Sequence, residues 1–351
     1  MRRFEFGRMP SGEVVEAVEI RNAKGMRLRV ISYGAAIQGL DVPDRHGRAA
    51  DVVLGYAELQ PYLARPEFFG AAIGRYANRI AGGAFVLDGQ RHTLATNEGT
   101  NTLHGGPGGF HNVLWRIDAA RGGDAPCVQL SYRSPDGEQG FPGELDVRVI
   151  YALDGDDTLR ITFEATTDEP TVVSLTSHPY FNLAGAGSGR TIHGHQVELA
   201  ADAYTPIDAS GVPTGEIRAV EGSPFDLRTR TVLDEPLRSH HVELAQVNGF
   251  DHNFVLRDGV TREPKFAARV TEPHSGRSLE VLTTEPGLQF YTGQKLGAGQ
   301  AATRALFHPH DGFAMEPQFF PDSPNRPDFP STRLDPGRTY RHVSLYRFSV
   351  E

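Results

Sequence analysis

Short runs in which hydrophobic and polar residues alternate recur along the chain. Clear examples are residues 145–151, 159–165, 195–199 and 279–284. Alternation with a period of two turns one face of a strand toward a core and the other face toward solvent. We find no run of helical periodicity longer than about three turns, the usual length of a helix. The pattern therefore predicts a protein built mainly from β-strands.

Turn-forming residues separate these runs. The segment Phe85 to Leu94 carries Asp88-Gly89 at its centre, a pair that suits the left-handed positions of a type I′ hairpin turn. Residues 340–348 are again strand-like, so we expect the end of the chain to belong to a sheet. No low-complexity linker divides the sequence. We predict an all-β fold: one domain over residues 1–351, formed as a large antiparallel β-sandwich with few short helices.

Composition narrows the class of protein. The 351 residues contain a single cysteine, Cys127, which excludes an internal disulfide framework and a cysteine-rich metal site. The net charge of -9 argues against nucleic acid or an anionic membrane as the main partner. The N-terminus lacks the apolar core of a signal peptide, and no apolar stretch approaches the ~20 residues of a membrane helix. We expect a cytoplasmic protein that binds neither nucleic acid nor membranes.

Several chemistries lack their sequence motifs. The chain has no phosphate-binding loop, no dinucleotide-binding glycine pattern, no nucleophile elbow and no His-Glu-x-x-His. The glycine-rich stretch 105–109 lacks the lysine and helix that phosphate binding requires, so we interpret it as a turn. The pairs His193/His195 and His308/His310 have the residue type to ligate an incidental metal. Only Asp311 adds a carboxylate beside them, and we predict no metal and no cofactor.

Polar side chains in several separate motifs are candidates for one binding site. A guanidinium offers five fixed donors, which suit hydroxyl or carboxylate oxygens. An amide flanked by aromatic residues is typical of a sugar site. Taken singly, each of these residues has a plain structural explanation, such as a turn carboxylate or an arginine that binds loop carbonyls. The candidates are Asn78, Arg79, His104, Asp251 and Gln289.

His178 and Glu316 are the candidates for proton transfer. His178 begins the sequence His178-Pro179-Tyr180-Phe181-Asn182, in which a strand-like run leads a histidine into a bend with two aromatics behind it. Glu316 lies among Phe, Ala, Met and Pro, where poor solvation should raise the pKa of a carboxyl group unless partners hold it ionised. For His178 to act as an acid, we expect nearby negative charge to hold its pKa up, with Glu316 and Asp251 as the sources.

These motifs, in this order, resemble the aldose 1-epimerase (galactose mutarotase) family. The resemblance runs from about residue 30 to the end and implies a large antiparallel β-sandwich with an open cleft. It further implies Glu316 as the base, His178 as the acid, and the substrate contacts Asn78, Arg79, His104, Asp251 and Gln289. His104 and Arg79 are candidates for polarising the ring oxygen or the nascent carbonyl. Tyr180 and Phe181 are candidate walls of the sugar site or supports behind it.

The implied reaction matches these residue types. Interconversion of the α and β anomers of a free aldose such as glucose or galactose opens the ring and recloses it on the other carbonyl face. One group takes the proton of the C1 hydroxyl while another protonates the ring oxygen, and glutamate and histidine suit these tasks near neutral pH. The partner is therefore a free monosaccharide, with no cofactor, and the chain is expected to be a monomer or homodimer.

Two other functions remain open at this stage. One is a carbohydrate-binding domain without turnover, which predicts loss of the acid or the base, although both are present. The other is a hexose-6-phosphate 1-epimerase, for which Arg75 beside Arg79 is the only nearby basic cluster. A metal-dependent hydrolase is a more distant alternative. One departure concerns sugar preference: many family members carry an asparagine after Tyr291-Thr292-Gly293, whereas this chain has Gln294-Lys295-Leu296.

Overall fold

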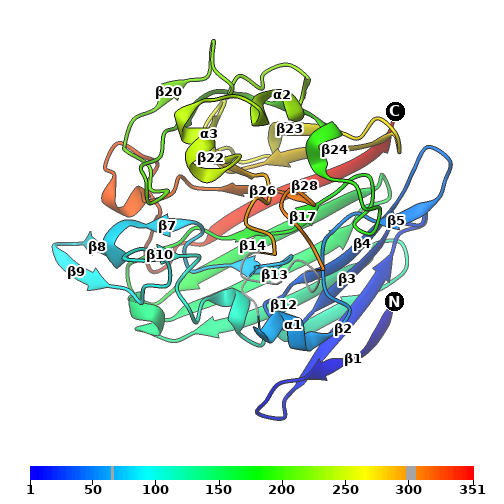
Figure 1. The fold of residues 1–351 in the computed structure, drawn as a ribbon. Coiled ribbons are helices and arrows are strands. Elements are labelled where there is room, and N and C mark those ends of the chain that lie inside the picture. The colour runs from blue at the N-terminus through cyan, green and yellow to red at the C-terminus, as the bar shows by residue number, and fades with distance from the viewer. Residues whose placement is uncertain (65–66, 298–305) are drawn as a thin grey trace.

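Antiparallel strands make up most of the fold of this computed structural model, which describes residues 1–64, 67–297 and 306–351 (Figure 1). The largest sheet has nine strands, and the C-terminal strand β28 lies in its middle. In order across the sheet, these are β11 (Arg116–Arg121), β12 (Cys127–Ser134), β13 (Leu145–Leu153), β14 (Thr158–Thr167), β28 (Tyr340–Val350), β24 (Arg277–Thr283), β23 (Lys265–Thr271), β18 (Gln196–Leu199) and β21 (Thr231–Val232).

Two further sheets and several short pairs complete the β-structure. The N-terminal sheet, blue in Figure 1, contains β1 (Arg2–Arg8), β2 (Val14–Arg21), β3 (Arg27–Ile31), β4 (Ile37–Pro43) and β5 (Ala49–Asp51). The six-stranded sheet contains, in order, β17 (Tyr180–Phe181), β26 (Phe313–Gln318), β25 (Gly287–Tyr291), β22 (Asp251–Leu256), β19 (Ala201–Thr205) and β20 (Arg218–Ala219). The two-stranded pairs are β6 (Ala72–Ile73) with β16 (Thr176–Ser177), β7 (Arg79–Ile80) with β10 (Thr102–Leu103), β8 (Ala84–Leu87) with β9 (Gln90–Thr93), and β15 (Thr171–Val172) with β27 (Arg333–Leu334).

Helices are few and short, as the sequence predicts. Those in the described residues are α1 (Leu59–Ala64), α2 (Asp234–Leu237) and α3 (Val242–Val247), together with single 3₁₀ turns. A membrane-crossing helix needs about 20 apolar residues, and none of the helices in the described part of the chain is long and apolar enough for that.

The core lies between the nine-stranded and six-stranded sheets. Alternate residues of β13 and β14 are buried, and they join one cluster with the inward-facing aromatics of the smaller sheet. Phe181 of β17 packs on Tyr346 of β28 with ring centroids 5.6 Å apart. The Tyr346 hydroxyl donates to the carbonyl of Met315 on β26 at 3.1 Å. The predicted antiparallel β-sandwich is therefore confirmed.

Local predictions from the hydrophobic pattern also hold. The runs at 145–151 and 159–165 fall in β13 and β14, and those at 195–199 and 279–284 fall in β18 and β24 except for one end residue each. Strands β8 and β9 form the predicted hairpin, with both Asp88 (φ 50°) and Gly89 (φ 78°) in the left-handed region. The stretch 105–109 is a close-approach turn, because a Cβ on Gly105 would lie 2.0 Å from the Gly74 carbonyl oxygen.

Candidate active site

Strand register brings the polar candidates onto one face of the six-stranded sheet. Asn253 of β22 pairs with Gln289 of β25, which pairs with Glu316 of β26. Two residues further along these strands, and so on the same face of the sheet, Asp251 pairs with Tyr291. Successive side chains of a strand point to opposite faces. Phe290 and Met315 lie between these two rows and belong to the sandwich core, so the polar rows face away from it.

Glu316 and His178 lie together in the site. Glu316 Oε1 is 3.5 Å from His178 Nε2, and both side chains are almost completely buried. Burial raises the pKa of Glu316 well above its ordinary value, and the negative charge of Asp251 adds to this while Arg79 opposes it. The sequence prediction of a raised pKa for this carboxyl group is confirmed.

His178 is held in place through its backbone. Its N–H donates to the Ala71 carbonyl at 2.9 Å, and its own carbonyl accepts from Gly70 N–H at 2.9 Å. Burial lowers its pKa to about 4, although the charge of Asp251 works in the opposite direction. The expectation that negative charge holds this pKa up is therefore wrong, because the loss of hydration outweighs the attraction of the Asp251 carboxylate.

The backbone fixes the tautomer of His104. Its Nδ1 accepts a hydrogen bond from the Asn78 N–H at 3.1 Å, so a neutral His104 carries its proton on Nε2. Burial lowers the pKa of this imidazole well below its ordinary value, and the nearby His178, His111 and Arg79 lower it further. His104 is thus a neutral hydrogen-bond donor beside the His178 ring, with centroids 5.3 Å apart.

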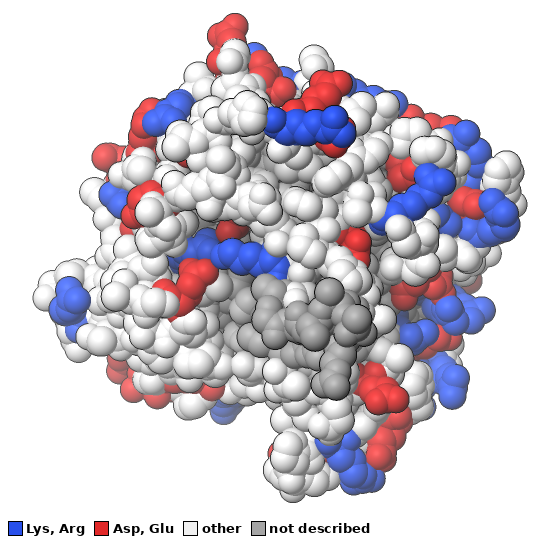
Figure 2. Space-filling view, in the orientation of Figure 1, with Lys and Arg blue, Asp and Glu red and all other residues white. Residues whose placement is uncertain are grey.

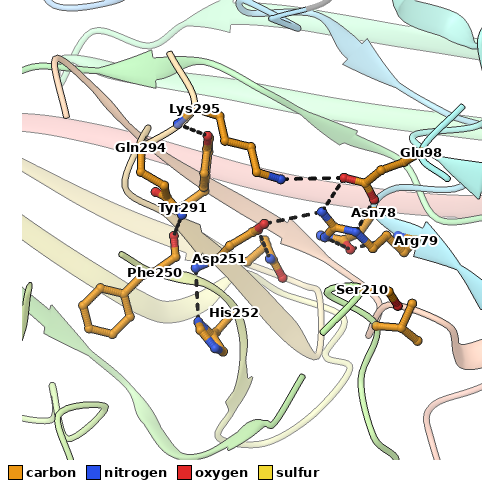
Figure 3. A network of polar contacts seen from close by, with 12 residues as sticks. Asn78, Arg79, Glu98, Ser210, Phe250, Asp251, His252, Tyr291, Gln294 and Lys295 are labelled. Atoms are coloured by element: carbon orange, nitrogen blue, oxygen red, sulfur yellow. Dashed lines mark hydrogen bonds and ion pairs between the residues drawn. The ribbon is translucent and has the colours of Figure 1, made fainter. Parts of the chain in front are cut away.

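Arg79 links two carboxylates at the site (Figure 3). Its Nε and Nη2 donate to the two carboxylate oxygens of Glu98 at 2.5 and 2.8 Å. Its Nη2 also lies 3.5 Å from Asp251 Oδ2. Burial works to lower the pKa of Arg79, but Asp251 and Glu98 raise it above its ordinary value. The preceding Asn78 accepts the Arg79 N–H on its side-chain oxygen at 2.8 Å, which orients the turn.

Asp251 is kept ionised although it is buried. Burial works to raise its pKa, but Arg79 and Lys295 lower it below the ordinary value, with help from a Gln289 hydrogen bond. Gln289 Nε2 donates to Asp251 Oδ1 at 2.8 Å. Gln289 stands in the same row of the sheet as Glu316, and its hydrogen bond orients the Asp251 carboxylate.

A cavity of about 160 Å³ joins most of the predicted residues. The predicted residues in its lining are Asn78, Arg79, His104, His178, Tyr180, Asp251 and Glu316. Tyr180 is the aromatic wall, with its ring 4.8 Å from that of His178. Phe181 points the other way, into the core. Of the two aromatics, Tyr180 therefore lines the site, whereas Phe181 is a support behind it.

Other lining residues were not predicted from the sequence. They are Glu67, Phe68, Glu98, Leu103, Tyr291, Lys295 and Leu296. Phe68 stands out because one ring packs against three imidazoles: His104 and His111 at 4.7 Å and His178 at 5.8 Å. Its backbone has φ 60°. The segment Glu67-Phe68-Phe69-Gly70 combines a carboxylate, aromatics and glycine. The predicted site motifs have a similar composition, so this segment could have been found in the same way.

The residues best placed to bind a metal ion lie in this pocket and not at the pairs His193/His195 and His308/His310. Among the described residues, His104, His178 and Glu316 offer ligand atoms within 4.8 Å of one another. His195 has turned inward, where its Nε2 accepts the Leu183 N–H at 3.0 Å. His310 Nδ1 lies 3.0 Å from the Thr292 carbonyl oxygen. Neither sequence-adjacent pair forms a group of three ligands in the described chain.

Arg75 has a structural role. Its guanidinium donates to the carbonyls of Ser134, Pro135, Pro142 and Gly143 at 2.6–3.0 Å. It does not line the cavity. The basic pair Arg75/Arg79, suggested by the sequence as a phosphate site, is therefore divided between a buried loop anchor and the pocket.

The fold and the pocket define a β-sandwich protein with a buried acid–base pair, and comparison with known proteins identifies the group. A family model described as aldose 1-epimerase matches residues 16–347. Galactose mutarotase of Sus scrofa is 47% identical over 350 residues, covering 99% of this chain and 98% of the relative. Aldose 1-epimerase of Escherichia coli is 36% identical over 347 residues, covering 97% of both chains.

Solved structures agree. An aldose epimerase homologue from C. elegans has a TM-score of 0.86 at 29% identity, covering 96% of this chain and 99% of that one. Galactose 1-epimerase from Lactobacillus acidophilus has a TM-score of 0.86 at 25% identity, covering 99% and 98%. The chain belongs to the aldose 1-epimerase family. The predicted class of enzyme, a mutarotase acting on aldoses, is confirmed.

Proposed function

We propose that the enzyme interconverts the α and β anomers of free aldoses such as glucose or galactose, with Glu316 as base and His178 as acid. The observation that carries this proposal is the buried pair itself. Glu316 Oε1 and His178 Nε2 lie 3.5 Å apart, and both residues line the same cavity. A carboxylate and an imidazole in this arrangement can reach the C1 hydroxyl and the ring oxygen, which are bonded to the same carbon.

The protonation states of the pair fit the two halves of the reaction. Ring opening converts an ionised Glu316 and a protonated His178 into a neutral pair, and reclosure reverses the transfers. Both forms hold one proton in total. Burial favours the neutral form, because it raises the pKa of Glu316 and lowers that of His178. The site therefore stabilises the protonation state that accompanies the open-chain sugar.

The closed sugar requires the ionic form of the pair. Sugar hydroxyls that donate to the Glu316 carboxylate offset part of the desolvation that disfavours this form. The charge of Asp251 also raises the pKa of His178, which favours the protonated imidazole. Substrate binding thereby shifts the shared proton from the carboxyl group to the imidazole, ready for the ring oxygen.

The neighbouring polar groups supply binding and polarisation. His104 presents an Nε2–H that can donate to the ring oxygen or to the nascent carbonyl. Arg79 and Asn78 offer further donors along the same wall, and Asp251 accepts from vicinal hydroxyls. Gln289 donates to Asp251 Oδ1 and is itself a further contact for the sugar. Tyr180 packs beside His178 and gives the sugar an apolar face.

An uncharged sugar suits the pocket better than a sugar phosphate. Among the described residues, the lining contains four carboxylates, Glu67, Glu98, Asp251 and Glu316, but only two cations, Arg79 and Lys295. Arg79 is already paired with Glu98 and Asp251. A phosphate dianion would meet this acidic excess, so the hexose-6-phosphate alternative loses its support.

The test is polarimetry on freshly dissolved α-glucose, α-galactose, xylose and arabinose. We expect the approach to anomeric equilibrium to accelerate with free aldoses. Methyl α-galactoside, which has no free C1 hydroxyl, should show no change, and galactose 6-phosphate should react poorly. A protein that binds galactose without accelerating its mutarotation would be a sugar-binding domain. A large loss of activity after chelation would show that a metal held by His104, His178 and Glu316 takes part.

We further propose that the chain acts as a single domain over residues 1–351, in the cytoplasm, as a monomer or homodimer. One continuous hydrophobic cluster that joins residues of all three large sheets supports the single domain. Basic and acidic side chains intermingle on the face shown in Figure 2, which gives nucleic acid no basic surface there. Sedimentation equilibrium at two protein concentrations would test the oligomeric state.

A further inference from the structure

Two oppositely charged side chains from separate loops meet at the outer end of the pocket. Lys295 Nζ lies 3.7 Å from Glu98 Oε1, and both residues line the cavity. The side chains of Lys295 and Glu98 are 59% and 29% exposed, whereas that of Glu316 is 2% exposed. Figure 3 shows them at the end of a row of alternating charges that begins at Asp251 and passes through Arg79.

The loop that carries Glu98 is fixed by hydrogen bonds. The Glu98 and Asn101 backbones exchange two of them, at 3.2 and 3.0 Å. The side chain of Asn97 binds both backbone groups of Leu103, accepting its N–H at 2.7 Å and donating to its carbonyl at 3.0 Å. Because Leu103 directly precedes His104, the position of Glu98 is tied to that of a catalytic imidazole.

The loop that carries Lys295 is fixed as well. The Lys295 N–H donates to the Tyr291 hydroxyl at 2.9 Å. Gln294 points away from the pocket, where its Nε2 donates to the Phe250 carbonyl at 3.0 Å and its Oε1 accepts from Thr292. Leu296 is buried. The segment in which this sequence departs from the family pattern therefore directs one charged side chain toward the pocket.

We propose that Glu98 and Lys295 together bind one hydroxyl group on the side of the sugar ring away from C1, and so set which aldoses the enzyme prefers. This inference rests on the proposed function, which puts C1 beside Glu316 and His178. The separation of 3.7 Å is too long for a direct hydrogen bond. A hydroxyl both donates and accepts, so it can accept from the ammonium group and donate to the carboxylate at once.

The chemistry of this pair gives discrimination as well as binding. Hydrogen bonds to charged groups are about twice as strong as those between neutral groups. A site built to bind a hydroxyl rejects an analogue that lacks it, because its own polar groups are then left unpaired. The pair therefore selects sugars by the presence and orientation of one hydroxyl, while the proton transfers at C1 stay the same.

The test variant is Lys295→Met, which removes the ammonium group and keeps the aliphatic side chain. We expect the KM for the preferred hexose to rise about 10-fold, with the loss in KM and not in kcat. Glu98→Gln should act in the same direction. Lys24→Met is the matched control. Lys24 Nζ lies 3.4 Å from Asp157 Oδ2 in a similarly exposed surface pair, and neither residue lines the pocket.

Deoxy sugars identify the bound hydroxyl. The KM of each variant is measured with the 3-deoxy, 4-deoxy and 6-deoxy forms of the preferred hexose. For the one deoxy sugar that lacks the bound hydroxyl, the KM of Lys295→Met should be close to that of wild type. The inference is overturned if Lys295→Met leaves the KM of the parent hexose within about twofold of wild type. It is also overturned if the variant weakens every deoxy sugar to the same extent as the parent sugar.

The wild-type rate separates this inference from the proposed function. If the wild-type protein does not accelerate mutarotation, the proposed function is wrong, whereas calorimetric binding of the hexose to wild type and Lys295→Met still tests the pair. If wild type is active and Lys295→Met keeps its KM and its calorimetric Kd, only the role of Glu98 and Lys295 is wrong.

Discussion

In the proposed mechanism His178 and Glu316 share one proton, and burial favours its place on Glu316. Each residue type was identified from the sequence, His178 from its aromatic bend and Glu316 from its apolar neighbours. The direction in which the pKa of His178 is shifted was not predicted correctly. It depends on how much water the pocket removes, and Phe68, which was not among the predicted site residues, contributes to that by packing against three imidazoles. Charge alone was a poor guide, because desolvation outweighs the field of Asp251.

The shared proton predicts an unusual pH profile for kcat/KM. The pair is active when it holds one proton. It gains a second proton, and activity is lost, only at acid pH, because burial lowers the pKa of His178 to about 4. Activity is also lost when Glu316 ionises fully, at a pH raised well above the usual range for a carboxyl group. We expect no acid limb near pH 6.5, and the limbs belong to the pair. A rate that falls to half its maximum near pH 6.5 as the pH is lowered would contradict this assignment.

Strands are the elements that the sequence predicted best, because period-two alternation requires only one buried face. Strands β13, β14, β18 and β24 and the hairpin at Asp88-Gly89 follow directly from it. The rows that join Asp251 to Tyr291 and Gln289 to Glu316 could not be predicted, because they depend on the register between strands that are distant in sequence. For the same reason, the hydrogen bond from Gln289 to Asp251 could not be predicted.

Gly287 tests the close packing of this sheet. A Cβ at this position would lie 2.3 Å from Asn253 Oδ1 and 3.0 Å from the Phe320 ring. We expect Gly287→Ala to lower the free energy of unfolding by about 1–3 kcal/mol, the usual cost of overpacking, as measured by urea denaturation. Gly194→Ala is the control, since a Cβ there meets nothing within 4 Å. Equal unfolding midpoints for the two variants would contradict the register.

The whole molecule buries several histidines in their neutral form. His111, His195 and His342 each have a pKa lowered by burial from 6.5 to about 4. Between these values the unfolded chain binds more protons than the folded one. Stability is therefore fully present above pH 6.5 and is lost as the pH falls toward 4. Such residues were visible in the sequence only as a high histidine count, because burial is a property of the assembled sandwich.

Urea unfolding at pH 7, 6 and 5 measures this loss. Each such histidine is expected to contribute about 2 kcal/mol of destabilisation between pH 7 and pH 5. His195→Gln places a side-chain oxygen near the position of Nε2, the acceptor of the Leu183 N–H, but removes the titration, so its slope with pH should be shallower. The exposed His240→Asn is the control and should keep the wild-type slope. An unfolding free energy that is flat from pH 7 to pH 5 would contradict the account.

The most direct test of the proton-transfer pair is the mutarotation rate of α-galactose, followed by polarimetry, for Glu316→Gln and His178→Asn beside wild type. Both substitutions keep a polar group of similar size, so the fold should be retained, as circular dichroism can check. We predict that each variant loses about 10²–10⁴-fold in kcat, the usual contribution of one proton transfer. A correctly folded variant of either residue with a near-wild-type rate would contradict the role of that residue.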